Sequence, residues 1–138
     1  MTAAEHDDAV AAISHVSHLL AAALAAAAAE AGPLALGLAA GSFRDGTRVA
    51  GSDPAFVTAM VEGNAAPTAA ALARVEAQLA RPWPELVVAG HAVATRGRDQ
   101  RTVRVPLDRA VLLSLGRAGG VVTRRLAAFV EGRVPQPE

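Results

Sequence analysis

Two histidines near the N-terminus, His15 and His18, are the residues whose type and spacing most directly suggest chemistry. In a helix, side chains three positions apart share one face, so these imidazoles form a pair, whereas His6 lies about half a turn away. Three interpretations are open: a metal site, two structural histidines bonded to backbone or water, or the polar lining of a pocket for an anionic ligand. No HExxH pattern or neighbouring carboxylate completes a coordination set, so we predict no metal site.

Arg48 is the second candidate, because it lies in a glycine-flanked polar segment, residues 41–51. This composition predicts a loop with exposed backbone N–H groups. An arginine in such a loop can offer two parallel donors to a carboxylate, and Arg44 with Asp45 could hold the loop in shape. The alternative is that Arg48 is a solvated surface arginine. Composition alone does not choose between these two interpretations.

The sequence lacks the common motifs that bind nucleotides. It contains no GxGxxG after a strand, no GxxxxGK[ST] and no GxSxG. The glycines between Gly116 and Gly120 follow a predicted helix and precede a possible strand, which reverses the order of a dinucleotide-binding turn. We therefore expect the chain by itself to bind neither NAD, NADP nor a nucleoside triphosphate.

Charge and composition narrow the class of protein. The chain has 13 basic and 13 acidic residues, so no net positive field favours nucleic acid or an anionic membrane. It has no cysteine, which excludes disulfides and thiolate metal sites and makes a reducing cytoplasm the default compartment. Glu5, Asp7 and Asp8 make the N-terminus acidic, unlike a secretory signal. We expect a cytoplasmic protein that binds neither nucleic acid nor membrane.

The elements that must position these residues are predominantly helical. Thr2 and Glu5 form a capping box, which predicts a long helix that ends near Ala31. Its most apolar run, Leu19 to Ala29, is shorter than the roughly 20 residues of a membrane span and predicts a buried helix. Aromatic residues are scarce, so the core must be built from Ala, Leu and Val, and alanine-rich faces suit tight dimers as well as tight monomers.

Further helices are expected over residues 34–40, 54–63, 67–80 and 108–115, a short strand over 102–105, and either helix or strand over 85–95. The predicted fold is mainly α: a compact helical domain with a long N-terminal helix and a possible short β element near the C-terminus. We expect a helical domain over residues 1–82. Residues 83–138 then continue that domain or form a small divergent element.

Together these residues resemble the C-terminal helical domain of prephenate dehydrogenase, the tyrosine-pathway enzyme. The resemblance covers roughly residues 3–80. It is carried by His6-Asp7, Ile13-Ser14-His15-Val16-Ser17-His18 before an apolar helix, Gly41-Ser42-Phe43-Arg44-Asp45-Gly46-Thr47-Arg48-Val49-Ala50, Ser52-Asp53-Pro54 and Asn64. Each segment alone has little specificity, but their order and separations together are specific.

In that family a Rossmann domain binds NAD or NADP and supplies the catalytic histidine, while the helical domain completes the substrate pocket and forms the dimer. The resemblance therefore implies a homodimer, a Rossmann domain in cis or in trans, a small dianionic substrate, and no catalytic residue in this chain. It also implies roles for six residues. His18 and Arg48 would contact the substrate, Gly41 would let the backbone approach it closely, and His15 would line or support the pocket. Asp45, which would orient Arg48, and Asn64 would have supporting roles.

Two departures from the family pattern bear on these roles. Ser17 stands where the family often has proline, and Val57 where it can have tryptophan, which makes the pocket wall less aromatic. The substrate, prephenate or arogenate, and the choice of NAD or NADP stay open. Two alternatives to the interpretation as part of an enzyme also stay open. One is a stand-alone binding or regulatory dimer that senses an aromatic-pathway acid, and the other is a structural dimer whose His and Arg residues are relics.

Overall fold

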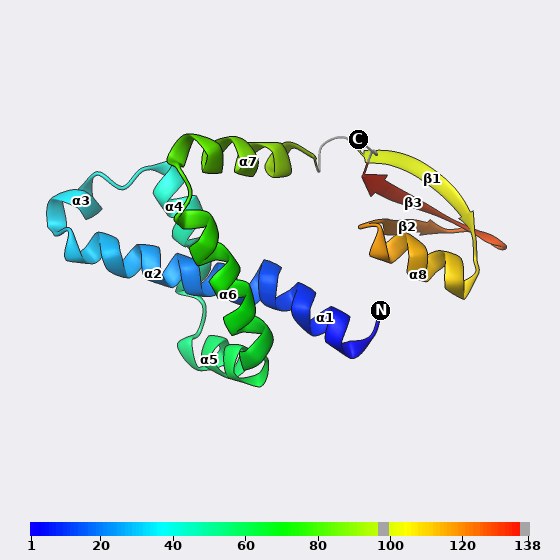
Figure 1. The fold of residues 1–138 in the computed structure, drawn as a ribbon, viewed down its shortest axis with the longest axis horizontal. Helices are drawn as coiled ribbons and strands as arrows, with labels where there is room; N and C mark the ends of the chain where they lie inside the picture. Colours follow the sequence, from blue (N-terminus) through cyan, green and yellow to red (C-terminus); the bar gives the residue numbers. More distant parts are fainter. Residues whose placement is uncertain (97–99, 136–138) are drawn as a thin grey trace. The chain divides into compact units, whose positions relative to one another are not determined.

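The computed structural model describes residues 1–96 and 100–135, and it confirms the mainly α fold (Figure 1). The elements are α1 (Ala3–Val10), the π-helical η1 (Ala11–His15), α2 (Val16–Glu30), α3 (Pro33–Gly37), α4 (Gly41–Thr47), the 3-10 helix η2 (Arg48–Gly51), α5 (Pro54–Gly63), α6 (Ala65–Leu79), α7 (Trp83–Arg96), β1 (Gln100–Pro106), α8 (Arg109–Arg117), β2 (Val121–Arg125) and β3 (Phe129–Pro135). The chain divides into two compact units, an N-terminal unit (Thr2–Ala77) and a C-terminal unit (Gln78–Glu138).

The N-terminal unit begins with one continuous helix, Ala3–Glu30, formed by α1, η1 and α2. The expected capping box is confirmed: Glu5 N donates to Thr2 Oγ1 at 3.1 Å, and Thr2 N donates to Glu5 Oε2 at 2.7 Å. Gly32, with φ of 93°, ends the helix in the left-handed region that favours glycine. Pro33 then opens α3, since its missing N–H is not needed in a first helical turn.

The core of the N-terminal unit lies where α6 crosses the long helix. Ala11 and Val16 of the long helix and Ala71 of α6 are buried together, and Leu72 and Val75 pack against them. The two alanines let the helices approach closely. The amphipathic spacing of Leu72 and Val75 had predicted this helix, and the structure gives it as Ala65–Leu79.

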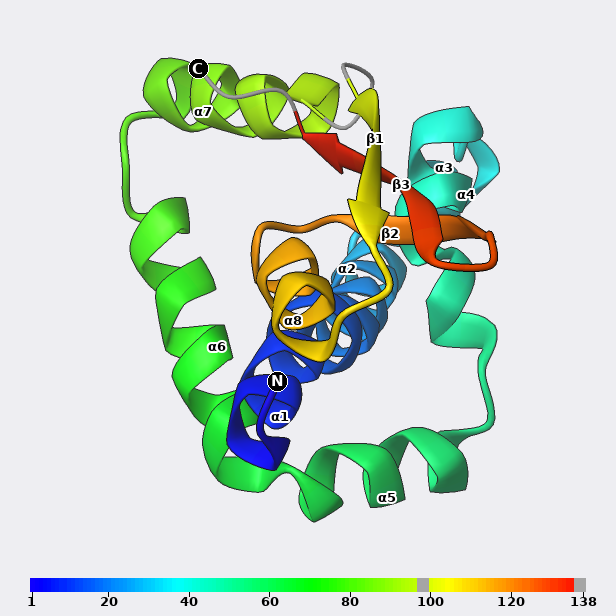
Figure 2. The same ribbon diagram turned by 90° about the vertical axis from the view of Figure 1, so that its right-hand side faces the viewer.

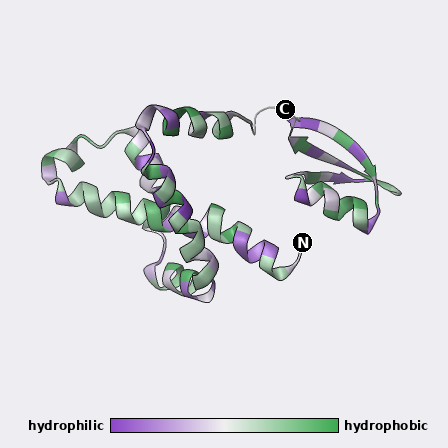
Figure 3. Ribbon diagram, in the orientation of Figure 1, coloured by the Kyte–Doolittle hydropathy of each residue, from purple (hydrophilic) through white to green (hydrophobic). Residues whose placement is uncertain are grey.

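The long helix exposes most of its apolar surface in the single chain. Figure 3 shows α2 mostly green along its length. Of residues 19–29 only Ala21 is buried, while Leu20 and Leu24 are exposed, so the prediction of a buried helix is wrong for one chain. By length and composition alone, Ala3–Glu30 is apolar enough to cross a membrane, a property that core helices of soluble proteins share. The rest of the N-terminal unit therefore leaves this apolar surface uncovered.

The C-terminal unit contains α7 and a three-stranded antiparallel sheet in the order β1-β3-β2. Residues 85–95 are helical, within α7, and the strand expected over 102–105 lies within β1. Helix α8 covers one face of the sheet (Figure 2). Leu115 of α8 and Val130 and Val134 of β3 are buried. Alternate residues of β3 are buried, as expected for a sheet with one covered face.

Candidate functional site

A cavity of about 220 Å³ in the N-terminal unit contains one of the predicted site residues, His18. The lining residues are His18 and Ala22 of α2, Val49 and Ala50 of η2, Ser52, and Pro54, Val57 and Thr58 of α5. The wall is mostly apolar, with an imidazole and two hydroxyl groups as its polar side chains. Such a wall can bind a small, partly apolar molecule and orient it through a few polar contacts.

His18 is partly buried, and its ring orientation is fixed by its own helix. Its Nδ1 lies 3.0 Å from the carbonyl oxygen of Ser14. Because a carbonyl oxygen can only accept, Nδ1 must carry a hydrogen and donate it. The other ring nitrogen, Nε2, then carries the lone pair of a neutral ring.

The segment expected to be a loop is helical. Residues Gly41–Thr47 form α4 and Arg48–Gly51 form η2, so the loop prediction is wrong. Tertiary packing overrides the low helix propensity of glycine here. A Cβ at Gly46 would lie 3.3 Å from Leu24 Cδ2, so this glycine permits close approach of α4 to α2, and Thr47 Oγ1 donates to the Phe43 carbonyl at 2.8 Å.

Arg48 is the first residue of η2, and its side chain is exposed. The two residues that follow it, Val49 and Ala50, line the cavity, so the backbone at Arg48 lies beside the cavity wall. Asp45 is exposed on α4, and within residues 1–96 and 100–135 no hydrogen bond or ion pair joins it to Arg48. Gly41 opens α4, and a Cβ built there meets nothing within 4 Å.

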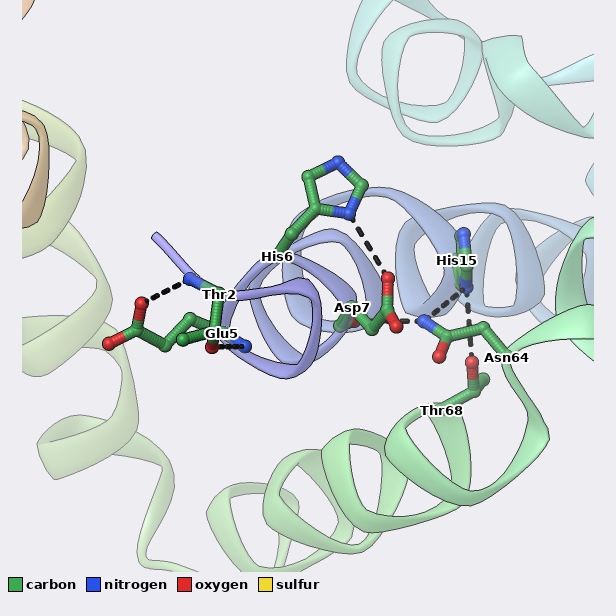
Figure 4. A network of polar contacts seen from close by, with 7 residues as sticks. All are labelled: Thr2, Glu5, His6, Asp7, His15, Asn64 and Thr68. Carbon is green, nitrogen blue, oxygen red and sulfur yellow. Dashed lines mark hydrogen bonds and ion pairs between the residues drawn. The ribbon is translucent and has the colours of Figure 1, made fainter.

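His15 and Asn64 belong to a separate polar network between the long helix and α6 (Figure 4). His15 is buried, and its Nδ1 lies 3.1 Å from Oγ1 of the buried Thr68. Asn64 Nδ2 donates to the Asp7 carbonyl at 2.8 Å. His15 does not line the cavity that His18 lines. The structure thus places the two histidines in different surroundings.

Three residues of these sites were not identified from the sequence: Ser52 and Thr58 in the cavity, and Thr68 beside His15. A signal for Thr68 does exist, because it precedes Leu72 by four residues and so is a polar residue on the apolar face of α6. For Ser52 and Thr58 the sequence offers no comparable signal. In the described part of the chain, no three His, Asp or Glu side chains are grouped so that they could hold a metal ion.

The sequence pattern of the family described as "Prephenate dehydrogenase, dimerization domain" matches residues 2–88, well over half of the chain. The chain belongs to this family. The resemblance found in the sequence is therefore confirmed. The matched range contains the whole cavity and the network around His15.

The chain is also similar to a solved structure from Corynebacterium glutamicum, whose protein carries a provisional assignment as a prephenate dehydrogenase. The two are 53% identical, with a TM-score of 0.53, over 54% of this chain and 23% of the other. This chain thus corresponds to about a quarter of that protein's length. No curated protein matches the chain.

Proposed function

We propose that this chain is the substrate-binding and dimerisation part of an NAD(P)-dependent prephenate dehydrogenase. The complete enzyme would serve tyrosine biosynthesis by oxidative decarboxylation of prephenate to 4-hydroxyphenylpyruvate. The observation that carries the proposal is the cavity in the family-matched region, which joins His18 to the backbone that follows Arg48. Prephenate is a dianion with an apolar ring, so we assign the ring to the mostly apolar cavity and a carboxylate to the guanidinium of Arg48, whose backbone lies beside the cavity wall.

The nucleotide and the catalytic histidine would come from a Rossmann domain, in cis or in trans. The turn from β1 to α8 is this chain's strand-to-helix turn in the C-terminal unit, and it does not fit a dinucleotide phosphate. There the Asp108 carboxylate accepts from the backbone N–H groups of Ala110 and Val111, at 2.9 and 3.1 Å. A carboxylate thus fills the place where a phosphate would sit at a helix N-terminus. The cap at Asp108 therefore supports our proposal that the nucleotide is bound by the Rossmann domain.

The dimer is supported by the contrast between a small core and a wide exposed apolar surface. Leu20 and Leu24 of α2, Leu34 of α3 and Leu38 directly after α3 are exposed, whereas the core cluster consists of Ala11, Val16 and Ala71. Apolar surface of this extent marks an interaction site. We assign it to a second copy of a cytoplasmic protein, and not to a membrane. The chain should therefore sediment as a dimer without detergent.

Substitution of Arg48 tests the substrate site, in an enzyme completed by a Rossmann domain of the same family. We expect Arg48→Ala to lower kcat/KM for prephenate at least about tenfold, since a charge-assisted hydrogen bond contributes about 1.5 to 3 kcal/mol. Arg48→Lys should also lower it, because lysine lacks the planar pair of donors. Folding should barely change, since Arg48 is exposed.

Arg44→Ala is the matched control, because Arg44 is also an exposed arginine, but neither of its neighbours in the chain lines the cavity, whereas Val49 follows Arg48 and does. It should leave kcat/KM nearly unchanged. If Arg44→Ala and Arg48→Ala lowered kcat/KM for prephenate equally, in folded dimers, the assignment of Arg48 as the contact to a substrate carboxylate would be wrong. The isolated chain should show no NAD(P)-dependent oxidation of prephenate. Turnover by the purified chain alone would overturn the proposal that it is only part of the enzyme.

A further inference from the structure

The C-terminal unit contains a second and larger cavity, between helix α8 and strand β1. Its volume is about 620 Å³, against about 220 Å³ for the cavity that His18 lines. Small-molecule sites commonly have volumes of roughly 300 to 1,000 Å³. The residues that line it belong to β1, α8, the residue after α8 and the end of β3, all beyond residue 88, where the family match ends. The family assignment therefore gives this cavity no role.

The floor of this cavity is the inner face of the sheet, which α8 covers. Val103 of β1 is paired with Gly132 of β3, and both are on this face. The next residue of β1 on the same face, Val105, is paired with the buried Val130. A Cβ built at Gly132 would lie 3.3 Å from Leu115 Cδ2, so Leu115 occupies the space over that glycine. Val103 and Val105 are half-buried and line the cavity beside Leu115.

The polar side chains of the cavity wall are one guanidinium and one hydroxyl. Arg101 stands two residues before Val103, so strand alternation places it on the same inner face. Among the described residues of the wall Arg101 is the only charged one, and Ser114 of α8 supplies the hydroxyl. Within residues 1–96 and 100–135, no carboxylate pairs with Arg101. The wall thus combines an apolar surface with a single positive charge.

We infer that this cavity binds a small molecule with an apolar body and one carboxylate. The carboxylate accepts two parallel hydrogen bonds from Arg101, and the apolar body lies between the two valines of β1 and Val111 of α8. No described residue of the wall is acidic, so an ammonium group has no partner there. A single cation also fits a ligand with one negative charge better than a dianion or an acidic protein surface. The inference does not depend on the proposed function.

Methyl and amide NMR spectra of the full chain, titrated with octanoate, test the site. Octanoate should shift the signals of Val103, Val105, Val111 and Leu115 and leave those of the His18 cavity unchanged. Octanamide has a similar apolar body and a neutral headgroup. Its dissociation constant should be at least about tenfold higher, because hydrogen bonds between charged groups are stronger than neutral ones. Octylammonium should not bind.

Two arginines of β1 provide a matched pair of variants. Arg101→Gln should raise the dissociation constant of octanoate at least about tenfold and leave that of octanamide unchanged. Arg104→Gln is the control, because Arg104 lies on the outer face of the sheet, over the Phe129 ring, and does not line the cavity. It should leave both dissociation constants unchanged. Ala118 also lines the cavity, so a folded Ala118→Phe variant should bind neither ligand.

Several results would overturn the inference. Equal affinity of the wild type for octanoate and octanamide would do so, whatever the variants show. Equal losses from Arg101→Gln and Arg104→Gln would attribute the binding to the net charge of the unit and not to a site. Octanoate shifts that are absent, or confined to the N-terminal unit, would leave the cavity without this ligand. Signals of Val103 and Val105 that change when the ligand-free chain is diluted would assign the cavity to a second copy.

Discussion

The two units of the chain differ in net charge, although the net charge of the whole chain is zero. Residues 2–77 contain eight acidic and three basic residues, whereas residues 78–138 contain five acidic and ten basic residues. The balance of 13 against 13 is thus the sum of an acidic and a basic unit. Net charge supports an argument about partners only when it is counted over the folded unit that would meet them.

The units also differ in how they bury their large apolar residues. In the C-terminal unit Leu115 is buried beneath the sheet, with Val130 and Val134. In the N-terminal unit several leucines are exposed, and its core cluster contains two alanines and one valine. An alanine contributes little burial free energy, so the core cluster of the N-terminal unit contributes little by itself. Both units leave large apolar side chains exposed, Trp83, Val87 and Val88 among them in the C-terminal unit.

The largest expected effect is loss of the dimer on placing a charge in the exposed face of α2. Leu20→Arg should raise the dimer dissociation constant at least about 100-fold, because an uncompensated buried charge costs about 3 to 5 kcal/mol. Val121→Arg is the control, an exposed apolar residue of the C-terminal unit, and should leave the dimer intact. Sedimentation at several concentrations measures both. Dissociation by Val121→Arg alone would move the interface to the C-terminal unit.

A core truncation in the C-terminal unit should have the next largest effect. Leu115→Ala should lower the free energy of unfolding of that unit by about 2 to 5 kcal/mol, through lost burial and the cavity left behind. Hydrogen exchange read residue by residue should report faster opening in β1 and β3, with α1 and α2 unchanged. Faster exchange in α2 as well would mean that the two units unfold as one.

The smallest effects are expected at two matched helix caps. The Asp53 carboxylate accepts from the N–H groups of Ala55 and Phe56 at the start of α5, and Asp108 does the same at the start of α8. Each change to alanine should cost about 0.5 to 2 kcal/mol. Chemical denaturation of each variant measures the loss. Raising the protein concentration should raise the unfolding midpoint of the N-terminal unit, in the wild type and in Asp53→Ala alike, and leave that of the C-terminal unit unchanged. A concentration-dependent midpoint for the C-terminal unit would contradict an interface confined to the N-terminal unit.

Local sequence rules predicted the helix boundaries well, because caps act over three or four residues. The capping box at Thr2 and the cap of Asp53 before Pro54 both formed as expected. The helix over residues 41–47 was missed because its stability comes from packing on α2, and the residues in contact, Gly46 and Leu24, are 22 positions apart. Helix propensity, summed over the residues of such a short segment, takes no account of that tertiary contact.

The candidate site could be predicted in part. The rest could not, again because it depends on contacts between residues far apart in the sequence. The sequence singled out His18 and Arg48 by type, spacing and resemblance, and the structure places His18 in a cavity. Thr68 could not be matched to His15, because the two lie 53 positions apart and meet only when α6 crosses the long helix.

The π-helical segment η1 determines how far α1 is rotated about the helix axis relative to α2. Val16 N–H bonds five residues back, to the Ala11 carbonyl, so Ala11–His15 contains a residue more than a regular turn. One residue corresponds to about 100° of rotation about a helix axis. Deleting Ala12 would restore the regular period and turn Ala3–Val10 by about that angle relative to α2. The Asp7 carbonyl would move away from Asn64, while His18 would keep its direction, so a single deletion would break the contact between Asp7 and Asn64 and leave the cavity that His18 lines in place.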